Sequence, residues 1–134
     1  MVHLMTDKND EKIRDAAIRL TMMPRDTNAH GTVFGGVILS YIDVAGGVEA
    51  VRHTKHERFV TVAMKEVIFH EPVFIGDLVS FYATTLNVGK TSITIHVEVE
   101  AERFGNKGEI VRVTSADITF VAINKLREKV RIGK

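Results

Sequence analysis

The chain has 134 residues, of which 45% are hydrophobic and 26% are charged, and its formal net charge is +1. This length and balance are typical of a single globular domain with a sizeable core, and the near-neutral charge, without a concentrated basic helix, argues against a nucleic-acid partner. Because the sequence has no cysteines, disulfide scaffolds, thiolate metal sites and thiol nucleophiles are excluded.

The first twelve residues are polar and carry mixed charges. They lack the apolar stretch of roughly 7 to 15 residues that a secretory signal peptide needs. No apolar run reaches the roughly 20 residues of a membrane-spanning helix. We therefore expect a soluble, cytoplasmic protein with no membrane partner. Its single domain is expected to span residues 1–134, with a core over 13–123 between a polar lead and a basic tail.

The first predicted element covers residues 13–23. Its apolar side chains occur both at helical offsets and at alternate positions, and the alternation, which ends at Pro24, favours a strand. Residues 25–33 contain Asp26, Asn28 and Gly31. These residue types are common in turns, so a loop is expected there.

The segment from Phe34 to about Arg52 is too long for a strand and too evenly apolar for a surface helix. It predicts a helix that is buried on most of its circumference. Asp43 lies in the middle of this helix, where a charge is costly unless it is paired, hydrated or protonated. The helix also contains four glycines, each costing about 1 kcal/mol relative to alanine. This composition indicates that something approaches the helix backbone closely.

Four strands are predicted after the helix, over residues 59–69, 78–88, 93–102 and 110–123. In residues 59–69, the even-numbered side chains from Val60 to Ile68 are expected to share one face. In residues 93–102, the odd-numbered side chains from Ile93 to Ala101 are expected to face the core. Short connections predict antiparallel neighbours, with the helix against the concave face of the sheet. One such sheet covers only part of an apolar helix, which suggests a partner subunit.

Two motifs resemble those of a known family. The first is Asp26-Thr-Asn-Ala-His-Gly-Thr-Val-Phe-Gly-Gly36, followed by an acid at Asp43. The second is Val67-Ile-Phe-His-Glu-Pro-Val-Phe-Ile-Gly-Asp77. With the strand order, they resemble the acyl-CoA thioesterase branch of the hotdog fold. That resemblance implies an α+β protein in which a five-stranded antiparallel sheet wraps one long buried helix.

The resemblance also implies an activity and an assembly. It implies hydrolysis of an acyl-CoA to a free acid and CoA, with no cofactor beyond the CoA of the substrate. Asp43 matches the catalytic carboxylate, Asn28 matches a polar partner supplied across the subunit interface, and Gly35 matches the residue whose N–H meets the thioester carbonyl. A homodimer is the minimum assembly, and trimers of dimers are common in similar proteins.

Thioester hydrolysis needs a carboxylate to activate water or to attack directly, and hydrogen-bond donors where the carbonyl oxygen gains charge. The first N–H groups of a helix have no intrahelical partner and can act as such donors. Gly35 and Gly36 would let a substrate approach them without a Cβ in the way. The sequence leaves open whether Asp43 acts as general base or as nucleophile.

Other residues leave alternatives open. His30 differs from what related sequences often have, and a histidine near the helix entry also resembles 3-hydroxyacyl dehydratases, although their His-Phe-Pro-Gly type motif is missing. We count it as a candidate for substrate binding. A non-catalytic acyl-CoA-binding protein is the other alternative.

Lys90, in Gly89-Lys-Thr-Ser92, is a candidate contact for a CoA phosphate, as are Arg103, Lys107 and the tail from Lys125. A triphosphate-binding loop would need a glycine at Thr84. The histidines show no convincing metal-ligand spacing, so no metal site is expected.

Overall fold

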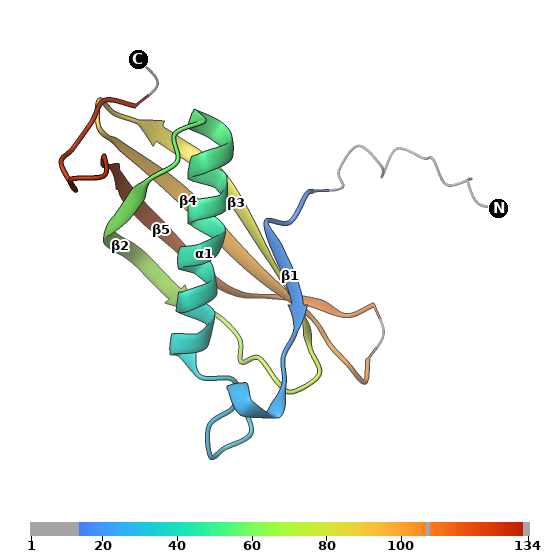
Figure 1. The fold of residues 1–134 in the computed structure, drawn as a ribbon. Helices are drawn as coiled ribbons and strands as arrows, with labels where there is room; N and C mark the ends of the chain where they lie inside the picture. The colour runs from blue at the N-terminus through green and yellow to red at the C-terminus, as the bar shows by residue number, and fades with distance from the viewer. Residues whose placement is uncertain (1–13, 107, 133–134) are drawn as a thin grey trace, which may run out of the picture.

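The computed structural model describes residues 14–106 and 108–132, and it contains one long helix and one five-stranded antiparallel sheet (Figure 1). The elements in chain order are β1 (Ile18–Thr21), the 3-10 helix η3 (Pro24–Asp26), α1 (Gly35–Thr54), β2 (Phe59–Phe69), β3 (Leu78–Val88), β4 (Ser92–Glu102) and β5 (Ile110–Ala122). This is the predicted architecture. The N-terminal lead, Ile13, Lys107 and the last two residues lie outside the described residues.

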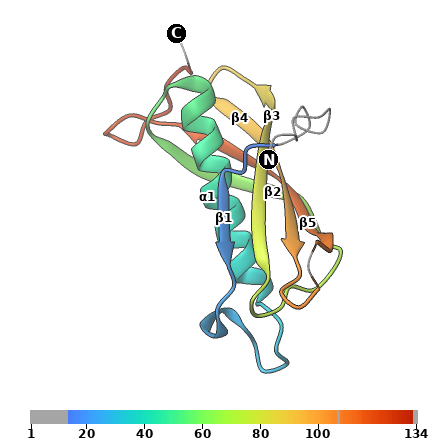
Figure 2. The ribbon, with the colours of Figure 1, turned by 90° about the vertical axis from the view of Figure 1, so that its right-hand side faces the viewer.

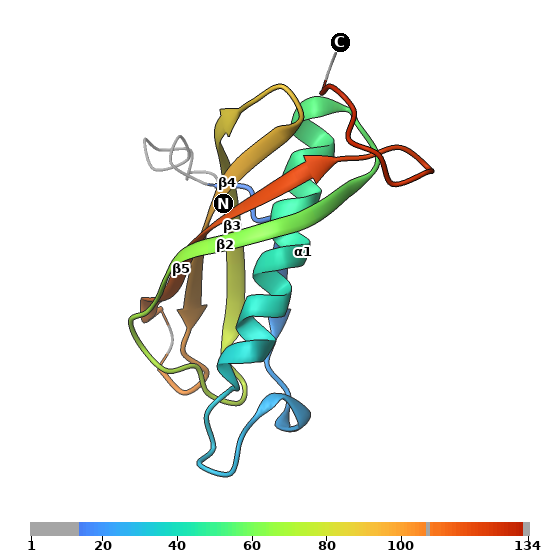
Figure 3. The same cartoon turned by 90° about the vertical axis from the view of Figure 1, so that its left-hand side faces the viewer.

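The strand order in the sheet is β1-β3-β4-β5-β2, and every neighbouring pair is antiparallel. The central strand β4 follows the predicted alternation, because its odd-numbered side chains from Ile93 to Ala101 are fully buried. The helix lies across one face of the sheet, as the two side views show (Figures 2 and 3). β2 and β1 therefore form the two edges, and the helix start lies at one end of the molecule.

One face of α1 packs on the sheet. Its buried residues recur three or four positions apart, as expected for one helical face; they are Ile38, Ile42, Ala45, Gly46 and Ala50. The closest approach is at Gly46, where an added Cβ would lie 2.9 Å from side-chain atoms of Ile118 and Phe120. On the other face, Val44 is 54% exposed and Val51 is 40% exposed. Within one chain the sheet therefore covers one face of the helix only, as expected for a single sheet, and burial of the other face by a partner subunit stays a prediction.

β2 does not follow its predicted alternation. Its register against β5 shifts between Thr61 and Ala63 and again between Lys65 and Ile68. Such β-bulges place an extra residue in one strand, which moves the following side chains to the other face. Val62 and Ile68 are consequently exposed, at 55% and 48%. β1 is also shorter than the predicted strand over residues 13–23, since only Ile18–Thr21 form it.

Candidate active site

The start of α1 is open to a ligand. Phe34 is the N-cap residue and forms no side-chain cap hydrogen bond, so the first N–H groups of the helix, including that of Gly35, keep their donor capacity and the positive end of the helix dipole. A pocket of about 360 Å³ adjoins this point. It is lined by Val33, Gly35, Ile38, Phe69, His70, Glu71, Pro72, Val73 and Thr114.

The two glycines at the helix start have different surroundings. A Cβ on Gly35 would lie 3.2 Å from the ring of Phe69, whereas a Cβ on Gly36 would meet nothing within 4 Å. Gly35 therefore allows β2 to approach the helix start closely. Gly36 leaves open space beside the same N–H groups, and the approach of a substrate to this backbone stays a prediction.

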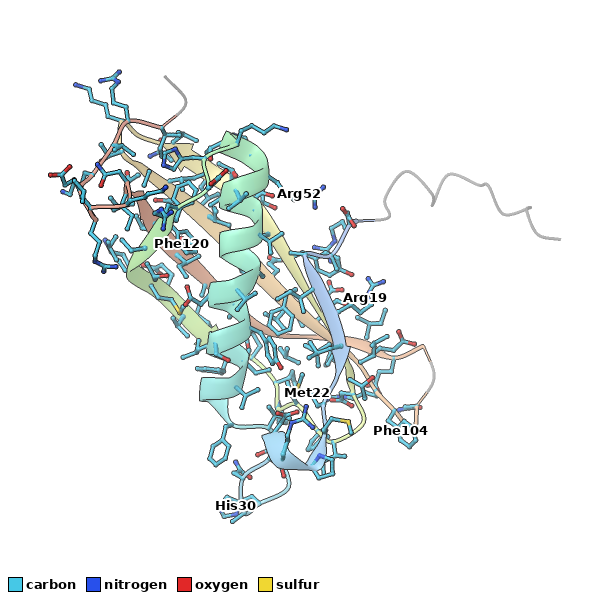
Figure 4. All side chains as sticks on the ribbon, in the orientation of Figure 1. Arg19, Met22, His30, Arg52, Phe104 and Phe120 are labelled. Carbon is cyan, nitrogen blue, oxygen red and sulfur yellow. The ribbon has the colours of Figure 1, made fainter. Side chains whose placement is uncertain are left out.

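Asn28 holds the loop that leads into the helix. Its Oδ1 accepts hydrogen bonds from the backbone N–H of His30 (2.8 Å) and of Thr32 (3.2 Å), and its Nδ2 donates to Oγ1 of Thr32 (2.9 Å). These bonds fix the loop in a single turn. His30 lies at the far end of this loop and points away from the sheet (Figure 4).

Asp43 contacts β2 through one short hydrogen bond. The hydroxyl of Thr61 donates to Oδ1 of Asp43 at 2.6 Å, so the carboxylate of α1 is held against the strand that forms the open edge of the sheet. A hydrogen bond to a charged group is stronger than one between neutral groups. Sequence reasoning missed Thr61, because only the pairing of α1 with β2 reveals its role.

The described chain does not bring all the predicted site residues together. Gly35 and Asp43 are separated by eight residues of one helix, which corresponds to about 12 Å along its axis. A single thioester group cannot reach both within one chain. Lys90 lies still farther away, in the turn between β3 and β4 at the other end of the sheet, where its carbonyl accepts from the N–H of Ile132.

The segment that closes the pocket at the helix start is held by a buried ion pair. Arg103 donates to Oδ2 of Asp77 at 2.6 Å and to the carbonyl of Pro72 at 3.0 Å. The same Oδ2 accepts from the N–H of Phe74 at 2.9 Å. The Arg103 side chain is only 14% exposed, and its guanidinium is already paired with Asp77. The structure therefore does not support the suggested contact of Arg103 with a CoA phosphate. Arg103 instead positions the segment that carries His70 and Glu71.

A comparison with known protein families shows which family contains this chain. Residues 30–107, more than half of the chain, match the family model described as "Thioesterase superfamily". The chain belongs to this superfamily. The matched region includes the helix start, Asp43 and Thr61, and it ends in the turn between β4 and β5. Among the described residues, no helix is long and apolar enough to cross a membrane.

Relatives of this thioesterase superfamily member are similar over most of their length. The acyl-CoA thioester hydrolase YciA of Escherichia coli is 36% identical, with 82% of this chain and 84% of YciA aligned. The hexameric hotdog fold thioesterase Cj0915 of Campylobacter jejuni is 43% identical, with a TM-score of 0.83 and 88% and 90% of the two chains covered. HI0827, a hexameric broad specificity acyl-coenzyme A thioesterase, is 38% identical, with a TM-score of 0.84 and coverage of 97% and 89%. The hotdog fold is therefore confirmed.

Proposed function

We propose that this chain is an acyl-CoA thioesterase that hydrolyses an acyl-CoA to a free carboxylic acid and CoA. The observation that carries the proposal is the position of Asp43, held by Thr61 on a helix whose uncapped start offers hydrogen-bond donors. Relatives at this level of identity are named acyl-CoA thioester hydrolases. The chemistry of the site and the family point to the same reaction.

In the proposed mechanism, the N–H of Gly35 donates to the thioester carbonyl oxygen and stabilises the negative charge that develops there. Asp43 either removes a proton from the attacking water or attacks the carbonyl carbon itself. Water supplies the new C–O bond, and the CoA sulfur leaves and takes up a proton. The reaction consumes only water and the CoA ester, and no cofactor takes part.

We propose that each site combines two chains, with Asp43 from one and Asn28 and Gly35 from the other. The separation of Gly35 and Asp43 within one chain requires a second chain if both act on one ester. β2 is an edge strand, and unpaired edges are a ready template for another strand. Two-fold pairing there would set two α1 helices antiparallel and cover exposed side chains such as Val44 and Val62.

In this proposal the assembly is at least a homodimer. We extend the proposal to a hexamer, because the solved relatives Cj0915 and HI0827 are hexameric. With Asp43 beside the partner's Gly35, the C-terminal end of each antiparallel helix extends past the start of the other, because eleven further residues of α1 follow Asp43. Lys90 of one chain then lies on the partner's side of the site and is proposed to meet a CoA phosphate. His30 and Gly36 are proposed to contact the substrate at the same helix start.

The single-domain organisation and the cytoplasmic location stay predictions.

The direct test is release of CoA from a panel of acetyl-, butyryl-, octanoyl-, decanoyl- and palmitoyl-CoA by the wild-type protein, followed with a thiol reagent. The proposal predicts release from at least part of this panel. Binding of acyl-CoA without release of CoA would favour the non-catalytic alternative. Loss of water from a 3-hydroxyacyl-CoA, without release of CoA, would favour the dehydratase and would contradict the thioesterase.

Replacing Thr61 with valine is expected to lower kcat by about 10- to 100-fold, because a hydrogen bond to a charged group contributes about 1.5–3 kcal/mol. The expected fall is in kcat rather than a rise in KM, since Thr61 positions Asp43 and need not touch the ester. Thr61→Ser keeps the hydroxyl and should retain most of the activity. Equal activities for the valine and serine variants would show that this hydrogen bond does not support catalysis.

A further inference from the structure

Four exposed apolar side chains gather at the end of the molecule that holds the helix start. They come from three connections: the segment after β1, the loop between β2 and β3, and the turn between β4 and β5. Phe104, in the last of these, is 78% exposed and lies at the outside of this end in Figure 4. We refer to the four residues as the end patch; they are Met23, Phe74, Ile75 and Phe104.

Backbone contacts bring the three connections of the end patch together. The N–H of Gly76 donates to the carbonyl of Met22 at 2.9 Å, so Met23 lies next to the loop between β2 and β3. An added Cβ on Gly76 would lie 3.1 Å from side-chain atoms of Phe104. The turn between β4 and β5 therefore packs directly on the same loop.

Arg103 fixes the turn to the loop. Its guanidinium lies over the ring of Phe74, 4.8 Å from the ring centroid, and pairs with the buried carboxylate of Asp77. Phe104 follows Arg103 in the chain and is placed by these contacts. A surface that is ordered before binding loses little conformational entropy on docking. The end patch is thus a preformed apolar surface, and such surfaces mark sites of interaction.

A hexamer needs a second contact surface besides β2. The proposed two-fold contact pairs the β2 edges of two chains, so it uses both edges and closes at two chains. The solved relatives Cj0915 and HI0827 are hexameric, and a hexamer built from such dimers must join them through another surface. The turn that carries Phe104 lies on the opposite side of the molecule from β2 (Figure 1). Pairing through β2 therefore leaves this turn accessible.

Charge disfavours two other exposed surfaces for contact between copies. The outer face of the sheet carries ion pairs such as Arg14 with Glu100, and burying charged groups has a desolvation cost. The end opposite to the end patch gathers cations around one pocket, and like charges on two copies repel; these cations are Lys55, Arg58 and Lys125. The end patch instead has the aromatic and methionine side chains that interfaces between proteins favour.

We propose that the end patch is the surface on which a second β2-paired dimer of this chain docks, with Phe104 as the anchor. The inference rests on the proposed thioesterase assembly and goes beyond it, because it assigns the residues that join one dimer to the next. Aromatic anchors supply much of the binding energy of such contacts. Phe74 directly follows Val73, which lines the pocket at the helix start, so the docked dimer lies beside the proposed site.

Single thiols test the contact without disrupting it. Because the sequence has no cysteines, Phe104→Cys places one thiol in the end patch of each chain. Leu126→Cys is the matched control, since Leu126 is 76% exposed, lies in the tail outside the patch and, like Phe104, follows a basic residue. In hexamers, Phe104→Cys should react with a thiol reagent at least about tenfold more slowly, because docking shields its thiol. Equal rates in the hexamer would overturn the inference.

A charge in the end patch tests the same contact through the assembly. Phe104→Asp is expected to sediment as a dimer, since an unpaired charge in an apolar interface is costly, whereas Leu126→Asp should stay hexameric. Far-UV circular dichroism should be unchanged in both, because both positions are exposed.

Hexamers of Phe104→Asp would overturn the inference. Binding of wild type, but not of this variant, to phosphatidylcholine–phosphatidylglycerol vesicles would assign the end patch to a lipid surface and would overturn it as well. A wild-type protein that sediments as a dimer would also contradict the docking of dimers. Release of CoA is measured separately, so failure of the thioesterase proposal is distinguishable from failure of this one.

Discussion

Asp43→Asn is expected to lower kcat for CoA release by about 10²- to 10⁴-fold, the range that a positioned general acid or base contributes. The substitution keeps the size of the side chain and an oxygen that can accept from Thr61. It removes the charge that activates water or attacks the carbonyl. The measurement is steady-state kinetics on the acyl-CoA that wild type hydrolyses fastest.

The same variant should remain folded, because Asp43 is only half-buried and its one described hydrogen bond can be kept. Its thermal unfolding midpoint and its sedimentation should match those of wild type. Activity within tenfold of wild type would assign Asp43 to structure and would remove the central residue of the proposed mechanism. Rapid single-turnover labelling of Asp43 with solvent ¹⁸O would separate a nucleophile from a general base.

Asp77→Ala is expected to lower the free energy of unfolding by about 3 kcal/mol, because breaking a buried ion pair leaves the other charge without a partner. The Asp77 side chain is 2% exposed, and it accepts hydrogen bonds from Arg103 and from the N–H of Phe74. Urea unfolding followed by far-UV circular dichroism measures the change. Activity should fall as well, since the segment from His70 to Val73 lines the pocket at the helix start.

The matched control for that substitution is Asp15→Ala. Asp15 pairs with Arg52 at 3.5 Å, but its side chain is 81% exposed, and exposed pairs contribute little to stability. No measurable change in unfolding is expected there. Equal effects of the two substitutions would show that the pair of Asp77 and Arg103 does not anchor the segment that closes the pocket.

Regular periodicity explains what could be predicted about the fold. The alternation in β4 arises because one face of this central strand is buried. The apolar run predicts a helix that ends at about Arg52, within two residues of the observed end at Thr54, because no alternating pattern competes with it. The faces of β2 could not be predicted. Its two bulges depend on how it pairs with β5, and nothing in its own residues marks them.

The sequence indicates candidate site residues only where those residues lie in one motif. The motif located Asp43, Gly35 and Asn28 along the chain, but Thr61 becomes visible only when α1 packs against β2. The buried pairing of Arg103 with Asp77 likewise joins residues 26 positions apart. Contacts of this kind depend on tertiary packing, which a pattern of residue types does not encode.

The central claim is that each site draws on two chains, and it is tested most directly by mixing two variants that are each expected to be inactive. Asp43→Asn and Asn28→Ala are each purified, unfolded together at equal concentrations, refolded and assayed for CoA release. A shared site predicts that activity returns to about one quarter of wild type, because half of the two-fold dimers are then mixed and each mixed dimer has one intact site. Activity that stays at the level of the separate variants would contradict the shared site and would place the catalytic residues within one chain.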